Sequence, residues 1–250
     1  MASKFETGHF VNLSNFGKLI SYLYSLPNYA PDAVELRLPQ LENLKTSLEA
    51  ATQNLVTSAA MLQQNINDRQ QLYTQTRKLA MRLMRYLEAS STDHEAIKDV
   101  KSHYKLLFAQ KLTKISNVAE DGTVSEKTYS SNRLSFDSLA ENFQKMYERI
   151  SIMIDYAPTD NTLQIPNLQQ KYQELLTTNT LLNNQYQAVY NARNTRDLLM
   201  YQKDTGLVDV AARVRKYVQY QYGFQSEAAQ YVKNINFTRK QLRIAEGVSI

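Results

Sequence analysis

The chain of 250 residues contains no cysteine and no tryptophan, and it has only 6 glycines and 5 prolines. Without cysteine there can be no disulfides, thiolate metal ligands or thiol nucleophiles. So few turn-forming residues predict few turns, and therefore long elements that we expect to be helices. Six scattered glycines also cannot build a glycine-rich phosphate loop, a nucleophile elbow or a dinucleotide fingerprint.

Long apolar runs and a strong charge of one sign are also missing. The most apolar stretches, at 150–154 and around Leu106, are far shorter than a bilayer span. The opening residues MASKFETGHF lack the basic-then-apolar pattern of a signal peptide, so we expect a cytoplasmic protein without a membrane segment. A net charge of +5 permits nucleic acid or an anionic membrane as a partner without requiring either.

Apolar residues make up 43% of the chain, a fraction typical of globular proteins. The chain is also unusually rich in tyrosine, asparagine and glutamine. The 17 tyrosines are more than one core easily absorbs. Because tyrosine is enriched at protein interfaces, this surplus favours protein–protein contact.

One motif occurs twice, as NYAPDAVELRLPQLENL from Asn28 and as DYAPTDNTLQIPNLQQK from Asp155. Aligning Tyr29 with Tyr156 keeps further identities in register without a gap, from Asn15 to Arg69. We therefore predict a tandem duplication. Its parts are an N-terminal arm (1–14), helical repeat 1 (15–111), a connector (112–141), helical repeat 2 (142–238) and a C-terminal tail (239–250).

Each repeat follows the same predicted plan. A short amphipathic helix with apolar residues at three- and four-residue steps comes first. The Tyr-Ala-Pro segment ends it, because the residue before a proline is disfavoured in the α conformation. An extended crossing of about seven residues follows, and a second proline sits in the first turn of a long helix. The structural corners of this plan are Tyr29, Pro31, Pro39, Tyr156, Pro158 and Pro166.

The long helix of repeat 1 is predicted from an unbroken apolar stripe between Leu41 and Leu87. In repeat 2 the stripe includes Tyr172 and Tyr186, which we expect in the core. QKDTG interrupts that helix, and Gly206 and Gly223 resemble helix stops on either side of a further helix at about 207–222. Terminal helices are expected at about 94–112 and 227–233.

These elements predict an all-α fold, in which the two tandem repeats pack as one elongated, pseudo-twofold helical bundle. The connector has a good turn pair, Asp121-Gly122, flanked by Val118, Val124 and Tyr129. A small hairpin and a flexible linker are both compatible with that pattern.

Candidate catalytic and metal-binding residues are few. The three histidines, His9, His94 and His103, do not have the spacing of metal ligands on a helix, so we interpret them as helix-start and surface residues. A stripe of acids repeats every seven residues in repeat 2 (Glu141, Glu148 and Asp155), but repeat 1 has Ser14, Ser21 and Asn28 there. We therefore expect a solvated stripe. No catalytic, cofactor or metal residue and no small-molecule substrate is assigned, and the protein is predicted not to be an enzyme.

Basic and aromatic residues gather toward the end of the chain. Phosphate contacts beside aromatic rings suit single-stranded nucleic acid, but acids such as Asp209 interrupt the basic groups, so a solvated helix face or a protein interface is favoured. The candidate interface comprises Tyr190, Tyr201, Arg213, Arg215, Lys216, Tyr217, Tyr220, Tyr222, Tyr231, Arg239, Lys240 and Arg243.

Residues 210–240, VAARVRKYVQYQYGFQSEAAQYVKNINFTRK, resemble the end of uncharacterised helical proteins from Bacteroidota and similar bacteria. The matching pattern is a basic VK-Y helix, a Tyr/Phe-Gly pair, a serine-containing turn and a Lys-x-Phe close. Here it comprises Val214, Lys216, Tyr217, Val218, Tyr222, Gly223, Ser226, Tyr231, Lys233 and Phe237. The resemblance implies a bacterial, all-helical, internally duplicated protein and no particular activity.

From the sequence we therefore predict a non-enzymatic structural or interaction protein. We expect it to self-associate into a homomeric filament, tube or lattice through helical surfaces rich in Tyr, Gln and Asn, because related surfaces at two places on one subunit can propagate head-to-tail contacts. The alternative is a basic helical adaptor that binds nucleic acid or an anionic membrane surface.

Overall fold

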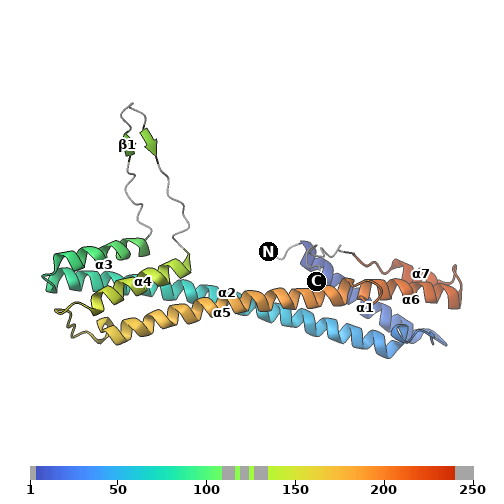
Figure 1. Ribbon diagram of the computed structural model, residues 1–250. Helices are drawn as coiled ribbons and strands as arrows, with labels where there is room; N and C mark the ends of the chain where they lie inside the picture. Colours follow the sequence, from blue (N-terminus) through green and yellow to red (C-terminus); the bar gives the residue numbers. More distant parts are fainter. Residues whose placement is uncertain (1–3, 109–115, 119–123, 127–134, 240–250) are drawn as a thin grey trace, which may run out of the picture. The chain divides into compact units, whose positions relative to one another are not determined.

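A computed structural model describes residues 4–108, 116–118, 124–126 and 135–239. These residues form seven α-helices and one small hairpin, which confirms the all-α prediction (Figure 1). The helices are α1 (Lys4–Ser25), α2 (Leu38–Ser90), α3 (His94–Leu107), α4 (Phe136–Ser151), α5 (Ile165–Tyr201), α6 (Leu207–Tyr222) and α7 (Glu227–Asn234). No helix in the described part of the chain is long and apolar enough to span a membrane.

The chain divides into two compact units. Unit 1 comprises the described residues of Met1–Met61 and Tyr186–Ile250, and therefore holds α1, the start of α2, the end of α5, and α6 and α7. Unit 2 is Leu62–Gln185, with the end of α2, α3, α4 and the start of α5. Each unit thus combines residues from both predicted repeats.

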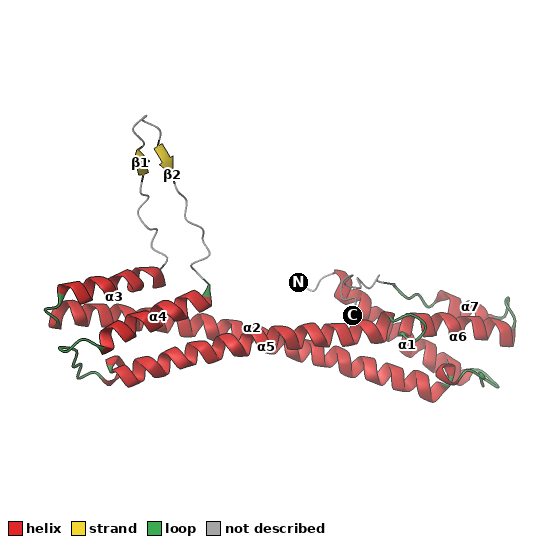
Figure 2. Cartoon of the chain, in the orientation of Figure 1, coloured by secondary structure: helices red, strands yellow, loops and turns green. Residues whose placement is uncertain are grey.

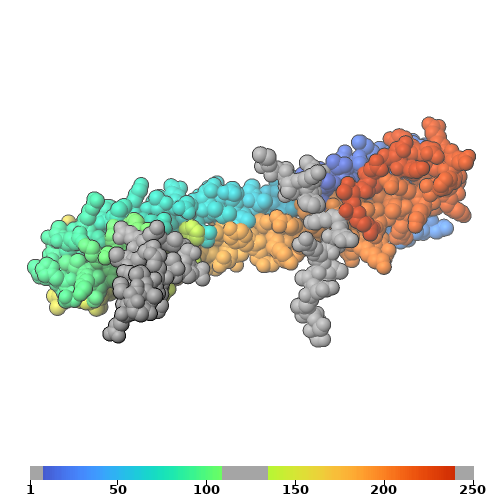
Figure 3. Space-filling view, turned by 90° about the horizontal axis from the view of Figure 1, so that it is seen from above, coloured from blue at the N-terminus to red at the C-terminus, as the bar shows by residue number. Residues whose placement is uncertain are grey.

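The core of unit 1 brings together one apolar face from each of its helices. The face of α1 follows the predicted spacing and buries Phe16, Leu19 and Leu23 completely. It packs in one cluster with residues of α2, α5, α6 and α7, including Leu41, Leu48, Met200, Val210, Val214, Val218 and Val232. In Figure 3 the blue surface of α1 borders the red surface of α6 and α7.

The core of unit 2 is a second, separate cluster. Residues of α4 and of the second half of α2 contribute most of it, and α3 and the start of α5 complete it. Its fully buried large side chains are Tyr73, Leu83, Leu87, Leu107, Phe143, Met146, Ile150, Leu168 and Leu175. In Figures 1 and 2, α3 and α4 run next to one another in this unit.

The two long helices are continuous. α2 has 53 residues and α5 has 37, and Pro39 and Pro166 each occupy the second position of their helix. Proline is tolerated there because the first amide hydrogens of a helix have no intrahelical acceptor. The predicted interruption after α5 is also present, since α5 ends at Tyr201 and α6 begins at Leu207.

The crossings before α2 and α5 differ from the prediction, because they are not extended throughout. Each contains one turn of 3-10 helix, at Val34–Leu36 and at Asn161–Leu163. Asp160 stabilises the second turn, as its side chain accepts a hydrogen bond from the Thr162 amide. A short i→i+3 turn satisfies backbone groups that an extended strand without a neighbour would leave unpaired.

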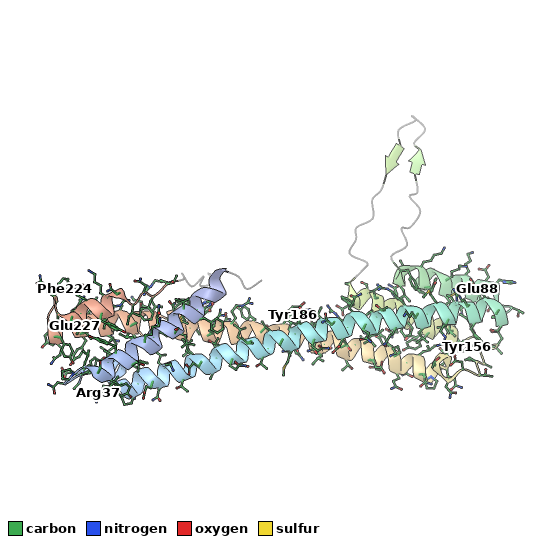
Figure 4. All side chains as sticks on the ribbon, turned by 180° about the vertical axis from the view of Figure 1, so that it is seen from behind. Arg37, Glu88, Tyr156, Tyr186, Phe224 and Glu227 are labelled. Carbon is green, nitrogen blue, oxygen red and sulfur yellow. The ribbon has the colours of Figure 1, made fainter. Side chains whose placement is uncertain are left out.

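Two further predictions were wrong. Gly206 does not end a helix: it is the N-cap of α6, with a φ of −70°, whereas Gly223, with a φ of 95°, does end α6. Tyr186 is half exposed and lies on the helix surface (Figure 4), while Tyr172 packs against the core of unit 2. Leu175, Leu182 and Val189, at seven-residue steps, are buried, whereas Tyr186 lies four residues after Leu182, at the edge of that narrow stripe.

The connector contains a short hairpin. Strands β1 (Ser116–Val118) and β2 (Val124–Glu126) pair antiparallel, with Val118 opposite Val124 (Figure 2). The predicted turn pair Asp121-Gly122 and Tyr129 lie outside the described residues.

Candidate functional site

The Tyr-Ala-Pro corner of unit 1 is closed by its tyrosine. The hydroxyl of Tyr29 donates to the backbone oxygen of Leu36 at 2.8 Å, across the 3-10 turn. Its ring meets the ring of Tyr217 on α6 edge to face, with centroids 5.4 Å apart. Burial raises the pKa of Tyr29 far above its usual value. Pro31 is buried, and its backbone oxygen accepts a hydrogen bond from Arg37 Nε at 3.2 Å.

The corner of unit 2 has the same contacts. Tyr156 donates to the backbone oxygen of Leu163, and its ring meets Tyr86 on α2 edge to face, with centroids 5.6 Å apart. Burial again raises the pKa of Tyr156. Pro158 is half-buried in this corner. The predicted corner residues therefore lie where each crossing packs on the end of a neighbouring helix.

Each corner and its neighbouring helix end form a surface that we call a tip. Tip 1 comprises residues 26–37 and 217–226, joined by a 2.8 Å hydrogen bond from the Tyr222 hydroxyl to the backbone oxygen of Pro27. Tip 2 comprises residues 152–164 and 86–93, joined by a 3.2 Å hydrogen bond from the Thr92 amide to Asp155. A hydrogen bond from Ser91 lowers the pKa of Asp155.

The tips carry the most exposed large apolar side chains of the described chain. At tip 2, Ile152 is 68% exposed and Ile154 is fully exposed, and at tip 1, Tyr220 is 83% and Phe224 69% exposed. The other exposed large apolar side chains range from 37% to 57%. Figure 4 shows Phe224 at one end of unit 1. Exposed large apolar side chains that gather at one place on a protein are typical of interaction surfaces.

A buried polar cluster lies inside unit 1. His9 is buried, contrary to the prediction that it is a surface residue, and its Nε2 lies 3.5 Å from Asp197 Oδ1. Arg196 donates to the same oxygen at 3.0 and 2.7 Å, from Nε and Nη2. Tyr201, predicted as an interface residue, lies against His9 with ring centroids 5.5 Å apart. The sequence signal for His9 is its position seven residues before Phe16, on the apolar face of α1.

A second buried polar cluster lies inside unit 2. The Tyr73 hydroxyl donates to the backbone oxygen of Phe136 at 2.6 Å, and Asn179 donates to Tyr73 at 3.0 Å and to Asp137 at 2.8 Å. The guanidinium of Arg69 stacks on the Phe136 ring, 3.8 Å from its centroid. These bonds tie α2, α4 and α5 together. Burial raises the pKa of Tyr73 to about 12.

Both clusters connect helices within their unit. His9, Arg196, Asp197, Tyr73 and Asn179 are buried, whereas Arg69 and Tyr201 are half-buried and Asp137 is exposed. In the described ranges, no group of three or more His, Cys, Asp or Glu side chains is placed to hold a metal ion. His94 begins α3, and His103 is half-buried on the same helix.

The acidic residues of the predicted stripe interact with nearby groups of the protein. Glu141 pairs with Lys145 at 2.6 Å, and Glu148 accepts a hydrogen bond from Gln144 at 2.7 Å. Together with the contact from Thr92 to Asp155, each acid of the stripe has a neighbour in the fold.

Many predicted interface residues are engaged within unit 1. Arg213 pairs with Glu35 at 2.6 Å, and Arg239 pairs with Asp209. Tyr231 stacks on Tyr22, with ring centroids 3.9 Å apart. The guanidinium of Arg215 lies 5.1 Å from the Phe237 ring centroid, and burial lowers its pKa. Side chains that were predicted to contact a partner therefore hold α1, the 3-10 turn at Val34–Leu36, α6, α7 and the segment after α7 together.

The remaining predicted interface residues are placed differently. Tyr190, Lys216 and Tyr220 are exposed, whereas Tyr217 and Tyr222 face the corner of tip 1. Lys240 and Arg243 lie outside the described residues. Phe224, Ile152 and Ile154 were not among the predicted interface residues, although large apolar residues beside a Gly or Pro turn are a recognisable signal.

Family models, curated proteins and solved structures were compared with the chain, and none of them matches it.

Proposed function

We propose that the protein is a structural protein that self-associates through its two tips. The observation that carries the proposal is the concentration of the most exposed apolar side chains, Ile152 and Ile154 on tip 2 and Tyr220 and Phe224 on tip 1. Burying one such side chain stabilises a complex by about 1.5–3 kcal/mol. A subunit with two separate apolar contacts can propagate into a filament, tube or lattice.

The duplication predicted from the sequence supports this proposal. The two corner tyrosines donate to corresponding backbone oxygens, Leu36 and Leu163, and each packs edge to face on a tyrosine of a neighbouring helix. We infer that the units descend from one ancestral repeat pair and are related by a pseudo-twofold arrangement. A duplicated unit supplies two tips on one chain, which is the minimum for an extended assembly.

The alternative, an adaptor for nucleic acid or an anionic membrane, has less support. Arginines that could contact phosphate are paired with acids, as Arg82 is with Asp160, Arg149 with Asp99 and Arg213 with Glu35. Such pairs reduce the free positive charge on the surface. The bacterial family resemblance of residues 210–240 and the cytoplasmic location remain predictions from the sequence.

The test is the molar mass of the purified protein, measured by size-exclusion chromatography with light scattering over a range of concentrations. We expect masses above the 28.8 kDa of one chain, rising with concentration. Placing a charge on a buried contact should weaken the association roughly tenfold or more, so Ile154→Lys combined with Phe224→Lys should give a monomer. Val56→Lys is the matched control, since Val56 is also exposed but lies on α2, away from both tips.

The single variants report how the tips pair. If tip 1 binds tip 1 of another copy and tip 2 binds tip 2, then the single variants Ile154→Lys and Phe224→Lys should each assemble no further than a dimer. If tip 1 binds tip 2, either variant alone should be a monomer. A wild-type protein that stays monomeric at high concentration contradicts the proposed function.

A further inference from the structure

The residues after α6 form an arm, Ser226–Arg239, which consists of α7 and an extended segment from Ile235. Asn12 on α1 binds the main chain of this segment twice: its amide nitrogen donates to the Thr238 oxygen, and its amide oxygen accepts from the Thr238 nitrogen, both at 2.8 Å. Asn15 donates to the backbone oxygen of Asn236, also at 2.8 Å. The segment is thus held through its backbone, as extended peptides are held in peptide-binding grooves.

Side chains of the arm alternate between the protein and solvent. Ile235 is buried and Phe237 packs against the core of unit 1, whereas Asn236 and Thr238 are exposed. Arg239 pairs with Asp209 on α6. We call the surface of α1 and α6 that holds this segment the groove; it contacts two apolar side chains at alternate positions, Ile235 and Phe237, and the cation Arg239.

This groove needs an occupant. Asn12 is fully buried under the segment, and its donor and acceptor are satisfied by Thr238. Removing the arm would expose the apolar face that packs on Ile235 and Phe237. Because each copy carries an identical arm, the arm of a second copy can make the same contacts in place of the resident one.

The turn that connects the arm to α6, which we call the hinge, is the segment that must open if the arm is to leave its own copy; in the closed form Ser226 N and Oγ donate to the Gly223 oxygen at 3.2 and 2.7 Å. Gly223 has a φ of 95°, and a Cβ added to it would meet nothing within 4 Å, so glycine is required there for the backbone conformation alone. Residues 223–225 are exposed. Tyr220 and Phe224, the most exposed aromatic residues of unit 1, flank this turn.

We propose that two copies of the protein exchange their arms, each arm occupying the groove of the other copy. An open hinge brings two copies together beside Tyr220 and Phe224, which become buried between them. This exchange rests on the self-association proposed above and identifies the partner at tip 1 as a second tip 1. All contacts of the arm are kept, so the two states differ mainly in the hinge and in this added interface.

The absence of native cysteine allows a direct test by crosslinking. Lys18 is exposed on α1 one turn after Asn15, and Asn236 is exposed on the arm. Full-length Lys18→Cys and Asn236→Cys proteins are mixed and treated with a short bismaleimide. We expect a crosslinked dimer containing one chain of each variant. The matched control pairs Asn236→Cys with Lys98→Cys, an exposed lysine on α3, and reports random collision.

A second variant tests the hinge. Alanine strains the closed turn at a φ of 95°, and opening the hinge relieves that strain. Gly223→Ala should therefore raise the ratio of crosslinked dimer to monomer about fivefold. If Gly223 only terminates α6, the substitution lowers the melting temperature without increasing the crosslinked dimer.

The outcomes separate this inference from the proposed function. Dimer formation no greater than with Lys98→Cys, together with crosslinks only within single chains of a Lys18→Cys, Asn236→Cys double variant, overturns arm exchange. If arm exchange is contradicted in this way but light scattering still gives molar masses above that of one chain, the protein self-associates without exchanging arms. If crosslinked dimers form while the variant Ile154→Lys leaves the molar mass in solution unchanged, the result supports arm exchange and contradicts the proposed contact at tip 2.

Discussion

At the scale of single residues, the buried polar side chains decide how the helices meet. Asn12 and Asn179 each satisfy partners on other elements, and Asp197 pairs with Arg196 and lies beside His9. A buried polar group costs free energy unless its hydrogen bonds are made, so each such group accepts few neighbouring arrangements. These residues therefore select one packing of the helices over others with the same apolar stripes.

Because of Tyr73, the stability of the protein should decrease with rising pH in the alkaline range. Its pKa is about 12 in the folded protein against 10.0 for an unperturbed tyrosine, because burial disfavours the phenolate. The folded state holds the proton more tightly, so this stabilising contribution is complete below pH 10 and is lost as the pH rises toward 12. Burial of Tyr29 and Tyr156 acts in the same direction.

We therefore expect the free energy of unfolding in urea to fall between pH 10 and pH 12. Tyr73→Phe should make that fall shallower, and at pH 7 it should cost about 1–3 kcal/mol, because Asn179 and the Phe136 oxygen lose a partner. Urea titrations at several pH values measure both effects. Identical pH profiles for the wild type and Tyr73→Phe would contradict this assignment.

At the scale of elements, prolines and glycines set where the helices begin and end. Pro39 and Pro166 occupy the first turns of the long helices, and Gly223 ends α6. Gly206 has a different role, which is close packing. A Cβ added there would lie 2.6 Å from the backbone nitrogen of Gln202, closer than real Cβ contacts come.

Gly206→Ala should therefore destabilise the protein by roughly 1–3 kcal/mol, because the junction between α5 and α6 must move. Gly8 on α1 is the matched control, since a Cβ there meets nothing within 4 Å. Gly8→Ala should be neutral or stabilising by up to about 1 kcal/mol, as alanine favours a helix. Thermal unfolding of both variants measures the difference, and equal melting temperatures would refute the packing role of Gly206.

At the scale of the whole molecule, two separate cores account for the stability of two units. Substitutions in one core should loosen the helices of that unit first. Leu23→Ala removes a fully buried side chain of α1 and should cost about 2–5 kcal/mol. We expect faster hydrogen exchange in α1, α6 and α7, with α3 and α4 retaining their protection.

Hydrogen exchange detected by mass spectrometry distinguishes the units, because peptides from α3, α4, α6 and α7 each belong to one unit. The matched variant is Leu87→Ala, a fully buried leucine in the core of unit 2, for which the pattern should be reversed. A uniform loss of protection across all helices in both variants would mean that the two units unfold as one.

The sequence by itself determined the helical class, the starts of the two long helices and the two corners, but not the start of α1 at Lys4 within the predicted arm or that of α4 at Phe136 within the predicted connector. These properties depend on neighbours along the chain: apolar spacing, and prolines that restrict the residues beside them. Only the tertiary structure decided which helices share a core, that His9 is buried, and that Arg213, Tyr231 and Arg239 contact their own chain. Those outcomes depend on residues far apart in the sequence, such as Asn12 and Thr238, whose proximity no local pattern specifies.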